Sequence, residues 1–255
     1  MHRCQLRKYA PGQWSLLAIA LLGLFFAMGT LAKGTLAKGT LAKDTLTESI
    51  NATPAHFMNE GKDIIAAIEY PPQAEEGTVT VRGAAKVSKG GTVRYVSIHT
   101  NSGQPELTEP FEQAVVKGLG NRWKISPAIV NGKQVKVWFN FSVVFEKYKD
   151  STRITLHESL VFNPSKHPSN YIDPQRYGRM PWPAACGKHE LRELTPIYIG
   201  TNIDKTGTPT NPRVLAGEVL ENCKQSLLKR ISEATFIPAM HNGNFVSGTH
   251  IEAWF

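Results

Sequence analysis

The sequence predicts an α+β protein in which one small unit, with the order strand–strand–helix–strand, occurs twice in tandem. Three observations lead to this prediction: a repeated sequence motif, an amphipathic helical pattern before each copy of the motif, and a strand–turn–strand pattern before each helix. In such a unit a three-stranded antiparallel sheet packs one face against a single helix. One helix is the smallest element that can cover the apolar face of such a sheet. Each unit is small enough for the two to support each other.

The repeated motif is found in two segments that align without gaps, Trp123–Val135 and Ala234–Val246. Both contain the pattern apolar-x-Pro-Ala-x-x-Asn-Gly-x-x-Val, and the two copies lie 111 residues apart. Proline stops a preceding helix and favours extended backbone. The Asn-Gly pair can supply the two positive φ angles of a tight turn. Each motif therefore predicts the end of a helix and a turn into the last strand of its unit.

An amphipathic helix is indicated before each motif by apolar residues at every fourth position. These residues are Phe111, Val115, Leu119 and Trp123 in the first copy and Leu215, Val219, Cys223, Leu227 and Ile231 in the second. Strands are indicated by β-branched and aromatic runs around Gly-containing turns and by period-2 alternation after the motif. The predicted strands are 78–87, 92–100 and 135–143 in the first copy, and 196–203, 208–214 and 249–255 in the second.

These patterns divide the chain into five segments. Their boundaries are 1–32 for a signal peptide or membrane anchor, 33–60 for a low-complexity linker, 61–148 for the first module, 149–176 for a connector and 177–255 for the second module. A five-residue unit, Gly-Thr-Leu-Ala-Lys, occurs three times between Gly29 and Lys43. A repeat this short is low-complexity sequence rather than a structural repeat, so we interpret it as a spacer.

The N-terminus has the pattern of an export signal. Arg3, Arg7 and Lys8 precede the apolar run Trp14–Met28, which contains no ionisable residue. A basic segment followed by an apolar one is typical of secretory signals. Two outcomes remain open: cleavage near residues 27–32, or retention as an inner-membrane anchor over residues 14–32, whose 19 residues lie within the roughly 17–25 that a bilayer requires. Either way, the protein is expected in the periplasm, with membrane contact through this segment only.

Charge and motifs exclude several classes of function. Six of the 29 basic residues lie in residues 1–43, which hold no acidic residue, so the remaining 23 basic residues face 21 acidic ones. This balance gives no support to a nucleic-acid partner. His157-Glu158 and His189-Glu190 lack the second histidine of a zinc-protease motif, and no phosphate-binding or nucleophile-elbow motif is present. We expect a protein that is not an enzyme and that needs no cofactor or metal.

Three cysteines are present, and Cys4 lies before the apolar run, on the reducing side of the membrane. Cys186 and Cys223 remain as an even pair in a chain bound for an oxidising compartment. One hypothesis is a disulfide across their 37-residue separation, which would stabilise the fold by roughly 3–4 kcal/mol. The other is that Cys223 is a small buried hydrophobe on the apolar stripe of its helix.

The first copy, and less closely the second, resembles the C-terminal domain of TonB, a family that transmits inner-membrane energy to outer-membrane transporters. The residues that carry the resemblance are Tyr70-Pro71 with Ala74, Gly77, the Gly90-Gly91 turn, the Phe111–Trp123 helix and the motif that ends at Val135. The resemblance implies that an extended peptide of an outer-membrane partner adds a strand to an open sheet edge.

In that family the exposed edge is the last core strand, and the resemblance carries this role to six residues. They are Val135, Lys136, Val137, Trp138, Phe139 and Phe141. A rival hypothesis uses the same edges differently: the two modules pair with each other and form an envelope scaffold that serves no transporter.

Overall fold

The computed structural model describes residues 50–99, 105–120, 125–160, 170–181, 183–186 and 197–254. These residues all belong to one folded region of the chain. The predicted export segment and the Gly-Thr-Leu-Ala-Lys repeats lie outside the described residues. In the part that is described, no helix is both long and apolar enough to span a membrane.

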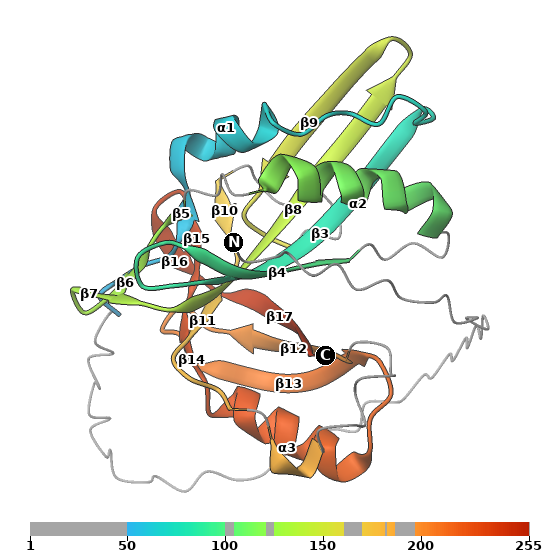
Figure 1. Ribbon diagram of the computed structural model, residues 1–255. Coiled ribbons are helices and arrows are strands. Elements are labelled where there is room, and N and C mark those ends of the chain that lie inside the picture. The colour runs from blue at the N-terminus through green and yellow to red at the C-terminus, as the bar shows by residue number, and fades with distance from the viewer. Residues whose placement is uncertain are drawn as a thin grey trace, which may run out of the picture. The chain divides into compact units, whose positions relative to one another are not determined.

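The first strand–strand–helix–strand unit follows the predicted order (Figure 1). Its elements are β3 (Gly77–Val87), β4 (Val93–His99), α2 (Pro105–Leu119) and β8 (Val137–Tyr148). β3 lies between β4 and β8 and is antiparallel to both. Helix α2 buries Phe111, Val115 and Leu119 in the same core as Phe139 and Phe141 of β8. These three residues of the predicted apolar stripe therefore lie on the face that covers the sheet, and the fourth, Trp123, lies outside the described residues.

The second unit repeats this order. Its elements are β12 (Ile197–Ile203), β13 (Pro209–Ala216), α3 (Glu221–Ser232) and β17 (Gly248–Trp254), with the sheet order β13-β12-β17. Cys223, Leu227 and Ile231 of α3 are buried in a core with Ile197 and Ile199 of β12. The order strand–strand–helix–strand therefore occurs twice in the structure, each time with one helix against an antiparallel sheet.

The repeated motif forms three short strands in each unit. They are β5 (Ile125–Ser126), β6 (Ala128–Val130) and β7 (Lys133–Val135) in the first, and β14 (Thr235–Ile237), β15 (Ala239–His241) and β16 (Asn244–Val246) in the second. Asn131 and Gly132 have φ angles of 50° and 72°, and Asn242 and Gly243 have 50° and 77°. Both pairs therefore make the tight turn with two positive φ angles that the sequence predicts.

Each unit begins earlier than the sequence predicts. β1 (Ala52–Thr53) and β2 (His56–Phe57) pair with β6 and β5, and β10 (Tyr171–Ile172) and β11 (Gln175–Tyr177) pair with β15 and β14 in the same arrangement. The equivalence extends to the turns, because the amides of Asn131 and Asn242 donate to the carbonyls of Asn51 and Asn170.

The predicted linker and connector are therefore corrected in part: residues 50–60 and 170–176 belong to the folded units. Two- and three-residue strands carry no periodic pattern, because their positions are set by the hairpins with which they pair.

The first sheet is larger than the predicted three strands. β9 (Ser151–His157) pairs with β8, and β11 joins β8 to β14, which gives a six-stranded sheet with the path β14-β11-β8-β3-β4 and β9 beside β8. Part of the predicted connector is thus a strand of the sheet. The remaining helical elements are η1 (Met58–Gly61), α1 (Lys62–Ile65) and η3 (Ala184–Cys186).

Candidate functional site

Strand β8 is paired along one whole side and along parts of the other, so the predicted binding strand is not an open edge over its whole length. On one side, all of β3 pairs with it, from Gly77 opposite Lys147 to Val87 opposite Val137. On the other side, β8 pairs with β11 at Val137 and with β9 from Ser142 to Tyr148. The chain itself therefore occupies one whole side of β8, but on the other side only Val137 and Ser142–Tyr148 have strand partners, and Trp138–Phe141 have none among the described residues.

Burial on both faces explains why β8 lies inside the sheet. Phe139 and Phe141 are fully buried against the core of α2, and Asn140, Ser142 and Val144 are buried on the opposite face. The sequence of a strand that is covered on both faces is a nearly continuous apolar run, without the alternation of apolar and polar residues that marks a strand with one exposed face. The run Val137–Phe145 contains this signal, since only Asn140 and Ser142 interrupt it.

The six predicted site residues separate into two groups. Val137, Phe139 and Phe141 are buried in the core. Val135, Lys136 and Trp138 line a groove of about 860 Å³. The other residues that line this groove are Lys86, Lys89, Arg176, Tyr177, Gly178, Arg179, Met180, Pro181, Glu252, Ala253 and Trp254. The groove thus lies between the start of β8, the segment after β11 and the end of β17, which are far apart in the sequence.

A buried ion pair forms part of the groove wall. The Nε and Nη2 atoms of Arg176 each donate to a carboxylate oxygen of Glu252 at 2.7 Å, and both side chains are only 4% exposed. Burial opposes ionisation of Glu252, but the charge of Arg176 and hydrogen bonds outweigh it and lower the pKa of the carboxyl. The guanidinium carbon of Arg176 also lies 5.8 Å from the centre of the Trp138 ring, within cation–π range.

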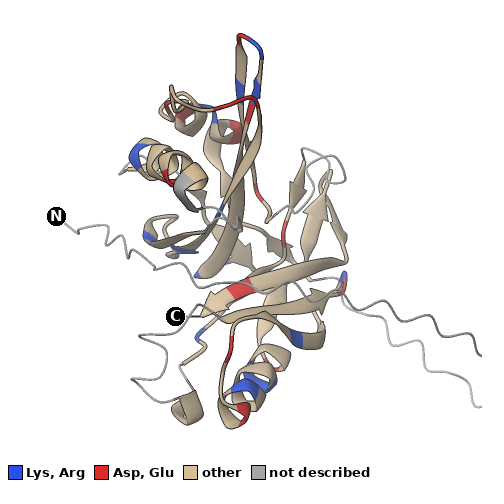
Figure 2. Ribbon diagram, turned by 90° about the vertical axis from the view of Figure 1, so that its right-hand side faces the viewer, with Lys and Arg blue, Asp and Glu red and all other residues tan. Residues whose placement is uncertain are grey.

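The rim of the groove is basic. Lys86, Lys89, Lys136 and Arg179 are exposed, and none of the four forms an ion pair within the described part of the chain. Glu252, whose charge Arg176 neutralises, is the single acidic residue among those that line the groove. Figure 2 shows that, over the described chain as a whole, basic and acidic positions are interspersed, so this local excess is not visible in the composition.

Two carboxyl groups, the half-buried Glu158 and the buried Asp173, lie in the segment that the sequence assigns to the connector. Glu158 accepts a hydrogen bond from the amide of Phe57, and Asp173 accepts one from the amide of Leu160 at 2.7 Å. Burial raises the pKa of Glu158 to about 7, although the Phe57 amide works against this rise. Burial also raises the pKa of Asp173 to about 7, with the Leu160 amide and the Asn140 side chain opposing.

The two units are joined by hydrogen bonds as well as by strands. The side chain of Gln175 donates to the carbonyl of Ala55 at 2.7 Å and accepts from its amide at 2.8 Å. The side-chain amide of Asn140 donates to the carbonyl of Ile251 at 3.0 Å. Gln175 and Asn140 are both buried, so these contacts fix the units to each other away from water.

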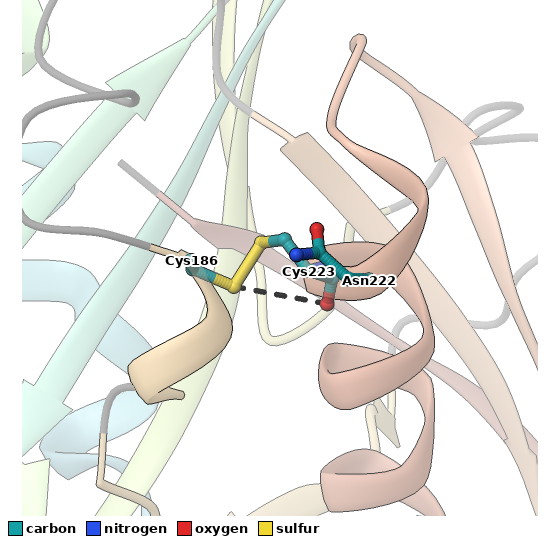
Figure 3. The surroundings of a disulfide bond; sticks show 3 residues. All are labelled: Cys186, Asn222 and Cys223. Atoms are coloured by element: carbon teal, nitrogen blue, oxygen red, sulfur yellow. Dashed lines mark hydrogen bonds between the residues drawn. A yellow bond between two sulfur atoms is a disulfide. The ribbon is translucent and has the colours of Figure 1, made fainter.

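Cys186 and Cys223 are joined by a disulfide that connects η3 to the first turn of α3 (Figure 3). Their Cα atoms lie 4.6 Å apart, and the bridge spans 37 residues. The side-chain oxygen of Asn222 accepts a hydrogen bond from the amide of Cys223 at 2.8 Å. Cys223 is also buried on the apolar stripe of α3, so the two hypotheses for this residue are compatible with each other.

Comparison with known protein families gives one match. Residues 66–146 match the family described as Gram-negative bacterial TonB protein C-terminal. The matched region covers β3, β4, α2 and most of β8, and a second copy is not matched. No curated protein and no solved structure matches the chain. The first unit is therefore similar to the C-terminal domain of TonB, a non-enzymatic family of transducers and binding proteins, which favours an envelope protein of the TonB type.

Proposed function

We propose that this chain is a TonB-like scaffold of the bacterial envelope, in which the two units are held together in cis. The observation that carries the proposal is the pairing of β8 on both sides by β3, β9 and β11. Adding a partner strand along the whole of β8 would require displacing β9 and β11, and with them a row of main-chain hydrogen bonds. The strand that a TonB-type domain offers to a transporter is thus used here for internal assembly.

Three further observations support the location and the architecture. Residues 66–146 match a family of envelope proteins, and the N-terminal sequence has the pattern of an export signal. The Cys186–Cys223 disulfide is suited to an oxidising compartment. We propose that the second unit is a divergent second copy, because its element order and its Asn-Gly hairpin repeat those of the first.

A peptide-binding experiment tests the scaffold proposal. Fluorescent extended peptides from outer-membrane transporters are titrated with the exported protein, with Val137→Pro, and with the exposed control Lys149→Ala. We expect none of the three to bind through β8, since Val137 already pairs with Val87 and Tyr177. Binding by the natural protein and by Lys149→Ala, with loss in a folded Val137→Pro variant, would contradict the scaffold proposal.

A second candidate function, peptide binding by strand addition in energy-coupled transport, is favoured by strand β4. Within the described residues β4 pairs with β3 alone, so its other side can receive a strand. Strand β13 also ends its sheet, but Pro209 and Pro212 and the positive φ of Asn211 (51°) interrupt any ladder there. Strand β4 is therefore an edge that is suited to an extended segment of an outer-membrane transporter.

Proline substitutions distinguish this second candidate. Successive amides of a strand point to opposite sides, so one of Val96→Pro and Ser97→Pro removes a donor from the open side of β4. We expect the variant that removes the outward donor to bind a transporter peptide more weakly while it remains folded by circular dichroism. Unchanged binding by both folded variants would exclude β4 as the binding edge.

A further inference from the structure

We infer that the groove between β8, the segment 177–181 and the end of β17 is a binding site for an acidic, extended polypeptide segment that carries an aromatic or aliphatic side chain. This inference does not rest on the scaffold proposal, because it involves neither displacement of β9 nor addition to β8. It applies equally if the protein couples to a transporter through another edge.

The charge of the groove selects an anionic ligand. Lys86, Lys89, Lys136 and Arg179 are four exposed cations that form no ion pair within the described chain. The one carboxylate of the groove, Glu252, is held by two hydrogen bonds from Arg176. The groove therefore presents uncompensated positive charge, which complements carboxylates of a partner and steers their approach.

The wall between these cations is largely apolar. Trp138, Met180 and Tyr177 are half-buried, and Trp254, which also lines the groove, is buried. Arg176 lies against the Trp138 ring and is itself fixed by Glu252, so the ring lies on a rigid support. Aromatic and methionine side chains are the surfaces that anchor apolar residues in protein interfaces. A ligand that fits this surface has an apolar side chain between its negative charges.

The backbone of β17 indicates a polypeptide rather than another anion. Asn140 donates to the carbonyl of Ile251, which shows that Ile251 directs its backbone groups away from β12. Because these directions alternate along an antiparallel strand, the N–H and C=O of Ala253 point to the same side. Ala253 lines the groove, and β17 is the last strand of its sheet among the described residues. An extended peptide can pair with these two groups while its side chains reach the basic rim.

Fluorescence anisotropy with labelled peptides tests this site in the exported, disulfide-bonded protein. The probe is a ten-residue peptide in which Glu alternates with Ser around a central Phe, and the comparison peptide has Gln in place of every Glu. We expect binding of the acidic peptide that weakens as salt is raised, and at least tenfold weaker binding of the Gln peptide. The groove variant K86Q/K136Q should bind the acidic peptide about tenfold more weakly, as expected for the loss of two ion pairs.

A matched control removes the same amount of charge elsewhere. Lys133 and Lys149 are exposed and lie outside the groove, so K133Q/K149Q should bind within about twofold of the natural protein. Trp138→Ala should also weaken binding, whereas its far-ultraviolet circular dichroism should match that of the natural protein. Equal losses in K133Q/K149Q and K86Q/K136Q would overturn the site, as would equal binding of the Gln peptide. Tighter binding of an oligothymidylate of similar length, or of anionic lipid vesicles, would overturn the assignment to a polypeptide.

Discussion

Replacing Asp173 with Asn should remove much of the pH dependence of this protein's stability. The carboxyl of Asp173 is buried beside Asn140 and the Leu160 amide, and burial raises its pKa from 3.8 to about 7. The folded protein therefore keeps a proton that the unfolded chain releases between about pH 4 and 7. The contribution of this group to stability is fully present below the unfolded pKa and is lost as the pH rises through the folded one.

The size of the effect follows from the two pKa values. A rise from 3.8 to about 7 is roughly three pKa units, and each unit corresponds to about 1.4 kcal/mol, so the full effect is about 4 kcal/mol. Between pH 5 and pH 8 the titration of Asp173 should lower the free energy of unfolding by about 3 kcal/mol. Glu158, whose pKa is also raised to about 7, acts in the same direction, so Asp173→Asn should retain part of the slope.

Urea unfolding at pH 5 and pH 8, followed by tryptophan fluorescence, measures this difference. The natural protein should be less stable at pH 8 than at pH 5, and Asp173→Asn should reduce that loss by about 3 kcal/mol. The control is Asp150→Asn, which removes an exposed carboxyl in the β8–β9 turn. The reasoning fails if the natural protein gains stability from pH 5 to pH 8, or if Asp150→Asn changes the slope as much as Asp173→Asn does.

Three other substitutions test separate parts of the structure. Cys223→Ser, which opens the 37-residue bridge, should lower the free energy of unfolding by about 4 kcal/mol in non-reducing urea titrations; a natural protein that carries two titratable thiols would refute this. Arg176→Met should lower the free energy of unfolding by about 3–5 kcal/mol, because it leaves Glu252 buried without its counter-charge. Replacing Arg176 and Glu252 together by apolar residues should restore most of that stability, as measured in thermal melts. Gly83→Ala places a methyl group 2.1 Å from Cζ of Phe141 and should lower the free energy of unfolding by about 1–3 kcal/mol. The loss should be smaller when the change is combined with Phe141→Leu, and equal losses in the two backgrounds would show that the ring is not the obstacle.

Local patterns in the sequence predict the elements that depend on neighbouring residues. The fourfold spacing of Phe111, Val115 and Leu119 predicts the buried face of α2, and these three residues are in the core. The Asn131-Gly132 pair predicts a tight turn because few residues adopt two successive positive φ angles. Such features are determined within a few residues of the chain, so one sequence is enough to recognise them.

The strands that pair with β8 could not be predicted from a local pattern in the same way. Its apolar character predicts a strand, but whether that strand is an edge depends on β9, which follows it after a short turn, and on the more distant β11, because both pair with it. Strand β9 is polar and β11 is short, so neither has a clear strand pattern, and the pairing of β11 also requires the closure of a long loop. The family resemblance places the binding edge on β8, and the additional strands of this chain cover parts of that edge.

The sequence by itself indicated the two strand–strand–helix–strand orders and the two Asn-Gly hairpins, because residue spacing and turn residues are local signals. It also led to the hypothesis that the two cysteines pair. The tertiary structure alone decided which strands are exposed and which side chains meet in the groove. Trp138, Arg176 and Glu252 come from β8, β11 and β17, and their contact requires all three strands to be assembled. A buried ion pair and a basic rim are properties of that assembly, since charge and burial depend on distances in space and not on separations along the chain.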